Sequence, residues 1–262
     1  METAAAFGFR WVGIQAPVPD DDSFDRWPEV SVWPAGARPL AADRVSGDHA
    51  QLIAKNGSIS LCRHPRRAVL EMPGPVSGSE LLRMYVARMA AVFTAWDGRI
   101  GLQAGAVRQE DKVLAVAGPT WAGKTTLLEA FGRDGGPVFC DELVALDGQR
   151  VQAGTPLLNL RADAAASLGP APVLSAAAGP SSAELGGLVH LAWGDRAELI
   201  PLAPADRMTA LIEARVAGAS KDLPPELIDL AGLPAWRFVR PKAWDAQPLA
   251  VAMLFDALEM IG

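Results

Sequence analysis

Cysteine and histidine are scarce in this chain of 262 residues, and their scarcity excludes two classes of protein. Two cysteines are too few for a disulfide framework. Because Cys62 and Cys140 both lie in apolar, strand-like runs, we expect them to be reduced core residues of a protein kept in a reducing compartment. The three histidines share no metal-ligand spacing with each other or with the cysteines, so we expect no zinc site.

Long apolar runs and an excess of positive charge are also missing. No stretch approaches 18 uninterrupted apolar residues, which argues against a transmembrane helix. Residues 1–7 have neither the basic start nor the apolar stretch of a secretion signal. The net charge of −6 and the pI near 5.1 argue against nucleic acid as the main partner. We therefore expect a cytoplasmic protein that binds neither membranes nor nucleic acid, with enough apolar residues for a large core.

What the chain does contain is a segment, Gly118-Pro-Thr-Trp-Ala-Gly-Lys-Thr125, that matches the phosphate-binding pattern G-x-x-x-x-G-K-[ST]. The apolar run 112–117 before it suits a buried strand, and residues 126–131 after it suit a helix. A strand that turns into a helix here points backbone N–H groups at one place, at the positive end of the helix dipole. The competing interpretation is a plain Gly-rich turn.

The pattern predicts binding of a nucleoside triphosphate, taken as ATP with Mg²⁺. Lys124 then reaches the β- and γ-phosphates, and the Thr125 hydroxyl ligates Mg²⁺. The residues expected to bind the nucleotide are Gly118, Pro119, Thr120, Trp121, Ala122, Gly123, Lys124, Thr125 and Thr126.

The chain divides into two regions by its strand and turn signals. Residues 1–75 read as a small β-rich region, with an Asn56-Gly57 turn that is typical of a hairpin. Residues 76–262 read as an α/β core with a mixed sheet. In this core a helix is expected over 80–96, with Ser79 as its N-cap. The stretch 162–187, rich in Ala, Gly, Pro and Ser, is expected to be a mobile loop.

Further elements follow the same signals. Strands are expected at 9–15, 30–33, 51–62 as a hairpin, 67–72, 100–107, 112–117, 138–140, 143–146, 188–193, 198–202 and 236–239. Helices are expected at 123–133, 204–217, 224–231 and 247–261.

Two adjacent carboxylates, Asp141 and Glu142, come directly after a short apolar strand. In proteins with a phosphate-binding loop, an acid at the end of a neighbouring strand typically holds Mg²⁺. A second acid there can accept a proton from an attacking hydroxyl. A solvated acidic turn is the alternative from the pattern alone.

The order of these motifs resembles the HPr kinase/phosphorylase-like family, which includes kinases of the protein HPr and relatives that phosphorylate precursor peptides. The resemblance covers residues 100–147. Its typical order is a strand with a His, the phosphate-binding loop, and an Asp-Asp pair followed by one residue and Val. Here Asp141, Glu142 and Val144 occupy the last positions, and Gln103 stands where the family has His.

The resemblance implies a phosphotransferase mechanism. By it, Lys124 holds the transferring phosphoryl group, Thr125 holds Mg²⁺, Asp141 is the base for the acceptor hydroxyl, and Glu142 supports the metal. The acceptor would be a peptide, a protein Ser/Thr or a small molecule, and homo-oligomers are common in the family.

Two departures from the family pattern keep other functions open. Gln103 cannot titrate, and Glu142 is one methylene longer than Asp, enough to move a metal ligand by about 1 Å. The alternatives to a kinase are a nucleotide-binding partner or regulator that has lost transfer, and a small ATPase.

Three basic groups have weaker functional signals. Arg161 either neutralises transition-state charge or is structural. The cluster 63–67 either recruits an acidic ligand or is a solvated turn, and Arg237, Arg240 and Lys242 either close over an anion or face solvent.

Overall fold

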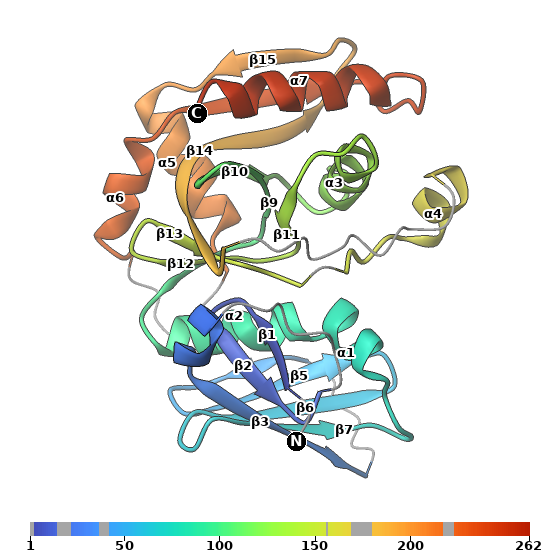
Figure 1. Ribbon diagram of the computed structural model, residues 1–262, viewed down its shortest axis with the longest axis vertical. Coiled ribbons are helices and arrows are strands. Elements are labelled where there is room, and N and C mark those ends of the chain that lie inside the picture. The colour runs from blue at the N-terminus through green and yellow to red at the C-terminus, as the bar shows by residue number, and fades with distance from the viewer. Residues whose placement is uncertain (1–2, 15–21, 37–41, 156, 169–179, 217–222) are drawn as a thin grey trace.

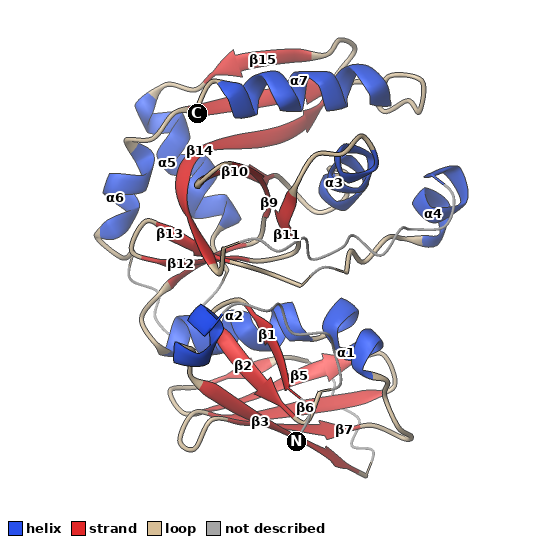
Figure 2. Cartoon of the chain, viewed as in Figure 1, coloured by secondary structure: helices blue, strands red, loops and turns tan. Residues whose placement is uncertain are grey.

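The computed structural model describes residues 3–14, 22–36, 42–155, 157–168, 180–216 and 223–262. Within them the chain forms two mixed β-sheets and seven α-helices, arranged as alternating layers (Figure 1). The first sheet lies at the bottom, α1 (Gly78–Met84) and α2 (Val86–Trp96) cover it, and the second sheet with α3 (Lys124–Arg133) and α7 (Gln247–Glu259) lies above (Figure 2). The predicted mixed α/β fold is confirmed in this coarse form.

The first sheet runs in the order β1-β2-β3-β7-β6-β5-β4. Its strands are β1 (Thr3–Ala6), β2 (Phe9–Val12), β3 (Glu29–Ala35), β4 (Arg44–Val45), β5 (His49–Ala54), β6 (Gly57–Cys62) and β7 (Arg67–Glu71), and a 3₁₀ turn covers Asp22–Arg26. The predicted hairpin is confirmed, since β5 and β6 pair, but its turn residues are Lys55 and Asn56, because Gly57 already pairs with Ala54 as the first residue of β6. The strand predicted over 9–15 is shorter, and Cys62 is half-buried rather than a core residue.

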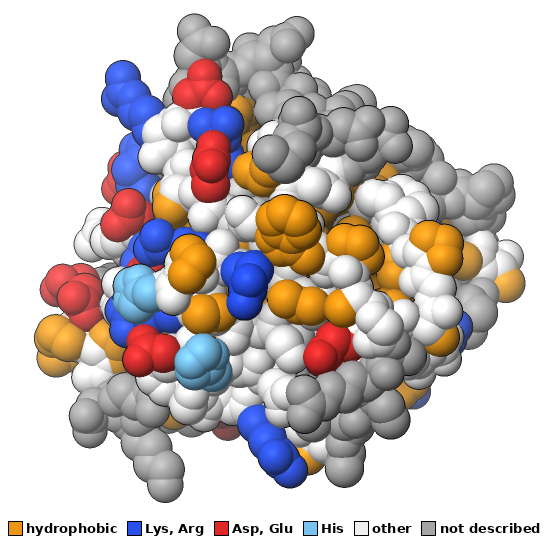
Figure 3. Space-filling view, turned by 90° about the horizontal axis from the view of Figure 1, so that it is seen from below, with side chains coloured by type: hydrophobic (Ala, Val, Ile, Leu, Met, Phe, Trp, Pro, Cys, Tyr) orange, Lys and Arg blue, Asp and Glu red, His pale blue; other side chains and the backbone are white. Residues whose placement is uncertain are grey.

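Alternation along these strands separates a buried face from a solvent face. Trp33 on β3 is 54% exposed, and its neighbour Val32 is buried. Seen from below, this side of the molecule carries hydrophobic side chains at its centre among basic, acidic and histidine side chains (Figure 3). The inner face joins α1, α2 and one face of the second sheet in one apolar core.

The predicted helix over 80–96 is instead two helices. Tyr85 separates α1 from α2 with φ −128°, outside the helical region. The apolar period continues across the break because Leu81, Leu82 and Tyr85 are all buried, so the periodicity does not reveal it. The N-cap is also different from the prediction. Ser77, not Ser79, accepts a hydrogen bond from the Glu80 N–H at 3.2 Å.

The second sheet runs in the order β11-β9-β10-β14-β13-β12-β8, and β16 pairs with β14 and β15. Its strands are β8 (Ile100–Leu102), β9 (Gly105–Gln109), β10 (Lys112–Ala117), β11 (Val138–Cys140), β12 (Val144–Asp147), β13 (Arg150–Gln152), β14 (Ser182–Trp193), β15 (Glu198–Pro201) and β16 (Ala235–Arg240). β10, β14 and β16 are parallel, and the other pairs are antiparallel. A second apolar core packs α3 and α7 on this sheet.

The predicted strand over 100–107 is interrupted. Only Gln103 and Ala104 separate β8 from β9, yet β8 pairs with β12 and β9 pairs with β10 and β11. β8 ends the strand order on one side and β9 is second from the other side, so two strands adjacent along the chain lie far apart in the order, and the sheet must curl.

The predicted mobile loop over 162–187 is wrong at both of its ends. Residues Ala162–Leu168 form α4, and β14 begins at Ser182. Residues 169–179 of the predicted loop lie outside the described residues. Gly186 and Gly187 lie within β14. Glycine is required at both positions, because a Cβ at Gly186 would lie 2.8 Å from the Ile261 side chain and one at Gly187 would lie 2.9 Å from the Pro234 carbonyl oxygen.

The remaining helices agree with the predictions within a few residues. They are α5 (Pro204–Ala214), α6 (Glu226–Ala231) and α7. Among the described residues, none of the helices has both the length and the apolar character that crossing a membrane requires. The predicted boundary at residue 75 stays a prediction, since α1 and α2 pack with both sheets.

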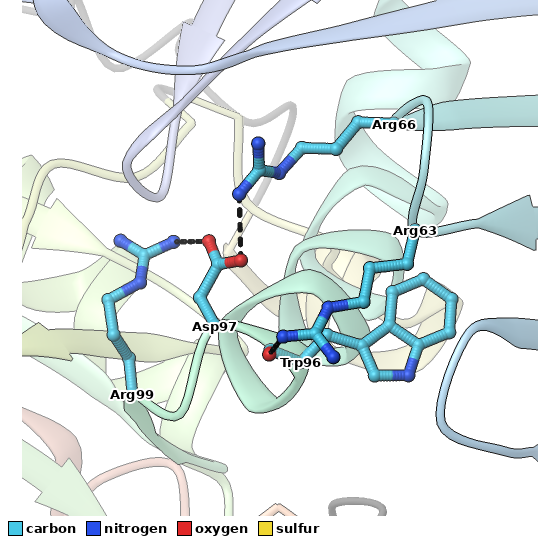
Figure 4. Close-up of polar contacts among 5 residues, drawn as sticks. All are labelled: Arg63, Arg66, Trp96, Asp97 and Arg99. Atoms are coloured by element: carbon cyan, nitrogen blue, oxygen red, sulfur yellow. Dashed lines mark hydrogen bonds and ion pairs between the residues drawn. The ribbon is translucent and has the colours of Figure 1, made fainter.

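A charged cluster ties the first sheet to the end of α2 (Figure 4). Asp97 binds Arg66 at 2.8 Å and Arg99 at 3.2 Å through different carboxylate oxygens. Arg63 donates a hydrogen bond to the Trp96 carbonyl oxygen. The basic run 63–67 therefore supplies two arginines to the end of a helix, which neither of the two sequence interpretations anticipated.

Replacing Asp97 with Asn is expected to lower the free energy of unfolding by about 1–3 kcal/mol, because Arg66 and Arg99 then face each other without a carboxylate. Urea unfolding measures it. Glu29→Gln is the matched control, since Glu29 also pairs with an arginine but its side chain is 58% exposed, and it should cost about 0–1 kcal/mol. Equal losses in both variants would show that the Asp97 cluster is not a structural link.

Candidate active site

The loop between β10 and α3 is shaped by two glycines with positive φ. Gly118 has φ +144° and Gly123 has φ +78°. A Cβ at Gly118 would lie 3.0 Å from the Leu191 carbonyl oxygen, and one at Gly123 would lie 2.5 Å from Arg240 Nη2. The glycines of the predicted motif are therefore required by conformation and by close packing. No side chain caps the N-terminus of α3, so its first N–H groups are suited to bind an anion.

Lys124 lies inside the curve of this loop. Its ammonium donates to the carbonyl oxygens of Gly118 at 2.8 Å and Pro119 at 3.2 Å. Burial lowers the pKa of Lys124, and the nearby Asp141 charge opposes that change. The ammonium is therefore partly desolvated, which strengthens its attraction for a phosphate.

Asp141 and Thr125 are brought together, as the motif order predicted. The Thr125 hydroxyl donates to Asp141 Oδ1 at 3.3 Å. Asp141 is 4% exposed, and burial raises the pKa of its carboxyl group. Its Oδ2 is buried, with no hydrogen-bond partner among the described residues. A carboxylate oxygen left without a partner beside a hydroxyl fits a Mg²⁺ ion, a cation that usually takes one or two carboxylates and completes its shell with phosphate and water.

No group of three His, Cys, Asp or Glu side chains capable of holding a metal occurs in the described part of the chain. The ligands at Thr125 and Asp141 therefore suit Mg²⁺ bound together with a polyphosphate rather than a site formed by protein alone.

Glu142 adopts an unusual backbone conformation, with φ +66°. Burial, together with the charge of Asp141, raises the pKa of Glu142 to about 7. Its Oε1 accepts a hydrogen bond from Asn159 Nδ2 at 3.1 Å. The sequence analysis did not anticipate this contact, because nothing in the spacing between Asn159 and the acidic pair indicates it. A carboxyl group held in place, with a pKa near neutrality, is suited to general base catalysis.

Two tryptophan–arginine stacks flank the loop. The Arg161 guanidinium carbon lies 3.1 Å from the centroid of the Trp121 ring, and Arg240 lies 4.2 Å from the Trp193 ring. Trp193 Nε1 donates to the Trp121 carbonyl oxygen at 3.1 Å, which links the two stacks. Trp121 has φ +72° and is 69% exposed.

Arg240 contacts the backbone of the loop on the side of β16. It is 3% exposed, and its Nη2 donates to the carbonyl oxygens of Ala122 at 2.8 Å and Gly123 at 3.1 Å. Burial lowers the pKa of Arg240 to about 10, and no acidic side chain pairs with it in the described residues. Of the basic stretch predicted to close over an anion, Arg240 and Lys242 line the cavity, whereas Arg237 does not.

All these side chains, including Arg240, line a single cavity of about 1000 Å³. The cavity is lined by Ala87, Arg88, Ala91, Gln103, Thr120, Trp121, Gly123, Lys124, Thr125, Thr126, Asp141, Glu142, Leu143, Asn159, Leu160, Arg161, Ala164, Trp193, Arg215, Val216, Arg240, Pro241, Lys242, Ala243, Trp244 and Gln247.

The predicted site residues fall into two groups. Gly118, Pro119 and Ala122 do not line the cavity, and their carbonyl oxygens instead bind Lys124 and Arg240. The other predicted residues line it, including Gln103, which is exposed and lies in the connection between β8 and β9. Sequence reasoning missed Trp193, Trp244 and Gln247.

No protein-family model and no curated protein matches this sequence. Among solved structures, the chain is similar to the structure of the Hpr(Ser) kinase/phosphatase from Coxiella burnetii, with 11% sequence identity and a TM-score of 0.37. The match covers 62% of this chain and 99% of that one. It is a distant structural relationship, and it carries no argument about activity.

Proposed function

We propose that the protein is an ATP-dependent kinase that transfers the γ-phosphoryl group to a hydroxyl group. The observation that carries the proposal is one cavity in which an uncapped helix N-terminus and Lys124 lie beside Asp141 and Glu142. Phosphoryl transfer needs chiefly positioning and neutralisation of charge, and these groups supply both.

In the proposed mechanism, Lys124 and the first N–H groups of α3 bind the phosphates. Thr125 and Asp141 would hold Mg²⁺, which neutralises phosphate charge when bound. The acceptor oxygen forms a bond to the γ-phosphorus as the bond to the bridging oxygen breaks, and ADP leaves with that electron pair. The acceptor proton passes to a carboxylate of the protein.

Two carboxylates are candidates for that proton. The sequence assigned the base to Asp141 and the metal to Asp141 and Glu142. The hydrogen bond from Thr125 supports Asp141 as the metal ligand, and the pKa of Glu142 near 7 supports Glu142 as the base. We therefore propose this division of roles.

The proposed acceptor is a peptide or protein Ser/Thr or a small molecule. We place the acceptor at the end of the cavity beside α2, which is lined by Ala87, Ala91 and Gln103. The acidic charge of the chain supports neither nucleic acid nor an anionic membrane surface as the partner. We also propose a cytoplasmic location, and a homo-oligomer remains part of the proposal through the sequence resemblance.

Gln103 supports a second candidate, a nucleotide-binding regulator without transfer. It lines the cavity and cannot exchange a proton near neutral pH, where the family resemblance implies a His that can.

Binding and transfer measured together test both candidates. Mg·ATP at 100 times its Kd is expected to stabilise the fold by about 2.7 kcal/mol, seen as a rise in melting temperature. Labelled γ-phosphate should then appear on a hydroxyl-bearing acceptor. Binding without transfer to any peptide or small-molecule acceptor supports the regulator, and acceptor-independent phosphate release supports an ATPase. No change in melting temperature at millimolar Mg·ATP contradicts nucleotide binding.

A further inference from the structure

Trp244 is an aromatic side chain at one end of the cavity. It belongs to the connection between β16 and α7, it lines the cavity, and it is 50% exposed. Among the described residues, its indole has no hydrogen bond and no ring contact. Half of a large apolar ring is therefore open to whatever occupies this end.

Two other tryptophans line the cavity, but each already carries a stacked arginine. Arg161 lies on Trp121, and Arg240 lies on Trp193. Trp193 is further fixed by its hydrogen bond to the Trp121 carbonyl oxygen. Among the cavity's described aromatic residues, Trp244 is the ring left without such a partner.

Gln247 links the segment that carries Trp244 to the first turn of α3. The Gln247 N–H donates to the Trp244 carbonyl oxygen at 3.1 Å, and the Gln247 side chain approaches the Thr126 carbonyl oxygen at 3.5 Å. Gln247 is 8% exposed and also approaches Arg240 at 3.5 Å. The connection that carries Trp244 therefore adjoins Thr126 and the underside of the loop.

The acidic pair lies on another side of the same helix turn. The Thr125 hydroxyl donates to Asp141, whereas Gln247 contacts the carbonyl oxygen of the next residue, Thr126. The metal ligands and the proposed base must lie at the terminal phosphate of a bound triphosphate, because that phosphate is transferred. The rest of the nucleotide therefore extends away from Asp141, and the free ring of the cavity, Trp244, lies on the connection that adjoins Thr126.

The opposite end of the cavity offers no ring. Its walls come from α2, from the β8–β9 connection and from the residue before β12, through Ala87, Ala91, Gln103 and Leu143. This end adjoins Glu142, where an acceptor hydroxyl must lie to give up its proton. The two ends thus differ in chemistry, one aromatic and one without aromatic side chains among the described residues.

We propose that the Trp244 ring is the surface on which a purine base of the nucleotide stacks, so that the cavity binds the base at the β16–α7 connection and the acceptor at α2. This inference rests on the proposed function, because it orients the nucleotide by the transferred phosphate. Stacking recognises the face of a base, and a purine has the larger face. Lys242 lines the same cavity and can provide a polar contact at the edge of the base.

The test compares Trp244→Ala with a matched control, Trp33→Ala. Trp33 is exposed to a similar extent, 54%, but lies on β3 of the first sheet and does not line the cavity. Calorimetry measures the Kd of Mg·ATP and of Mg·tripolyphosphate for both variants and the parent. Trp244→Ala is expected to raise the Kd of Mg·ATP by about 5- to 150-fold and to leave that of Mg·tripolyphosphate unchanged. Trp33→Ala should change neither.

Other outcomes overturn the inference. Unchanged ATP affinity in Trp244→Ala, with normal binding by the parent, removes the base site and leaves the proposed kinase intact. An equal loss for ATP and tripolyphosphate shows that Trp244 supports the loop and does not contact a base. Parent affinities for CTP and UTP equal to those for ATP and GTP contradict the preference for purines. If the parent binds no nucleotide, the proposed function fails and the base site fails with it.

Discussion

Replacement of Lys124 by Ala is expected to reduce phosphoryl transfer by on the order of 10²–10³-fold and ATP affinity by about 10- to 100-fold. The ammonium is held by the carbonyl oxygens of Gly118 and Pro119, in the curve of the loop where the phosphates should bind. It is partly desolvated, so a phosphate that replaces water around it gains a strong charge-assisted contact. Calorimetry with Mg·ATP and a labelled-phosphate assay measure the two losses.

The Lys124 variant should keep its fold. Burial lowers the pKa of Lys124, so the charged ammonium contributes little stability of its own. Thermal unfolding should be near that of the parent when nucleotide is absent. Lys55→Ala serves as the control, because Lys55 is exposed at the β5–β6 turn and its loss should change neither rate nor affinity. ATP affinity that survives in Lys124→Ala would remove the phosphate-binding assignment of the loop.

Elements set by local chemistry were predictable from the sequence. The β5–β6 hairpin was predicted at its place in the chain, although its turn residues are Lys55 and Asn56, and β10, a loop with two positive-φ glycines and α3 follow one another in the predicted order. The break at Tyr85 was not predictable, because a continuous apolar face hides it. The second half of β14 was predicted as a strand over 188–193, but its first half, with Gly186 and Gly187, was not predictable, because only the packing of Ile261 and Pro234 explains glycine there.

The candidate site divides in the same way. The proximity of Thr125 and Asp141 follows from motif order, and the structure shows their hydrogen bond. The Trp193–Arg240 stack depends on the parallel register of β14 and β16, in which these residues are direct partners. The register between two strands so far apart in the chain depends on the tertiary fold, and it could not be predicted from a single sequence. The contact of Arg240 with the phosphate-binding loop could therefore not be predicted before the fold was known.

Glu142→Gln is the second change with a large expected effect, and it separates the two carboxylates. The parent's kcat/KM, which reports the free enzyme, should rise with pH through about 7 and then level off, because only ionised Glu142 accepts the acceptor proton. Glu142→Gln should lower the transfer rate by on the order of 10²–10⁴-fold, with little change in ATP affinity. Asp141→Asn should instead weaken Mg²⁺-dependent ATP binding, because the oxygen that lacks a partner belongs to Asp141. A Glu142→Gln enzyme that stays active beside an inactive Asp141→Asn enzyme would return the base to Asp141.

Stability gives an independent measure of Glu142, without any substrate. Its folded pKa of about 7 lies above its ordinary value of 4.5, so the folded state holds the proton more tightly than the unfolded state. The destabilising effect of the carboxylate is absent below about pH 4.5, grows as the pH rises, and is complete above about pH 7. Gln does not titrate and can keep the hydrogen bond from Asn159. The variant should therefore be more stable than the parent at pH 8, by about 1–3 kcal/mol.

The gain in stability should shrink as the pH is lowered toward 5, because the parent's Glu142 is then protonated in the folded state. Urea unfolding at pH 5 and pH 8 measures the difference. A gain of the same size at both pH values would mean that Glu142 does not titrate near neutrality, and the pH–rate profile would then need another carboxylate. A gain confined to high pH, together with the loss of transfer, would show that one buried group both destabilises the fold and accepts the proton, which is the compromise expected of a side chain kept for catalysis.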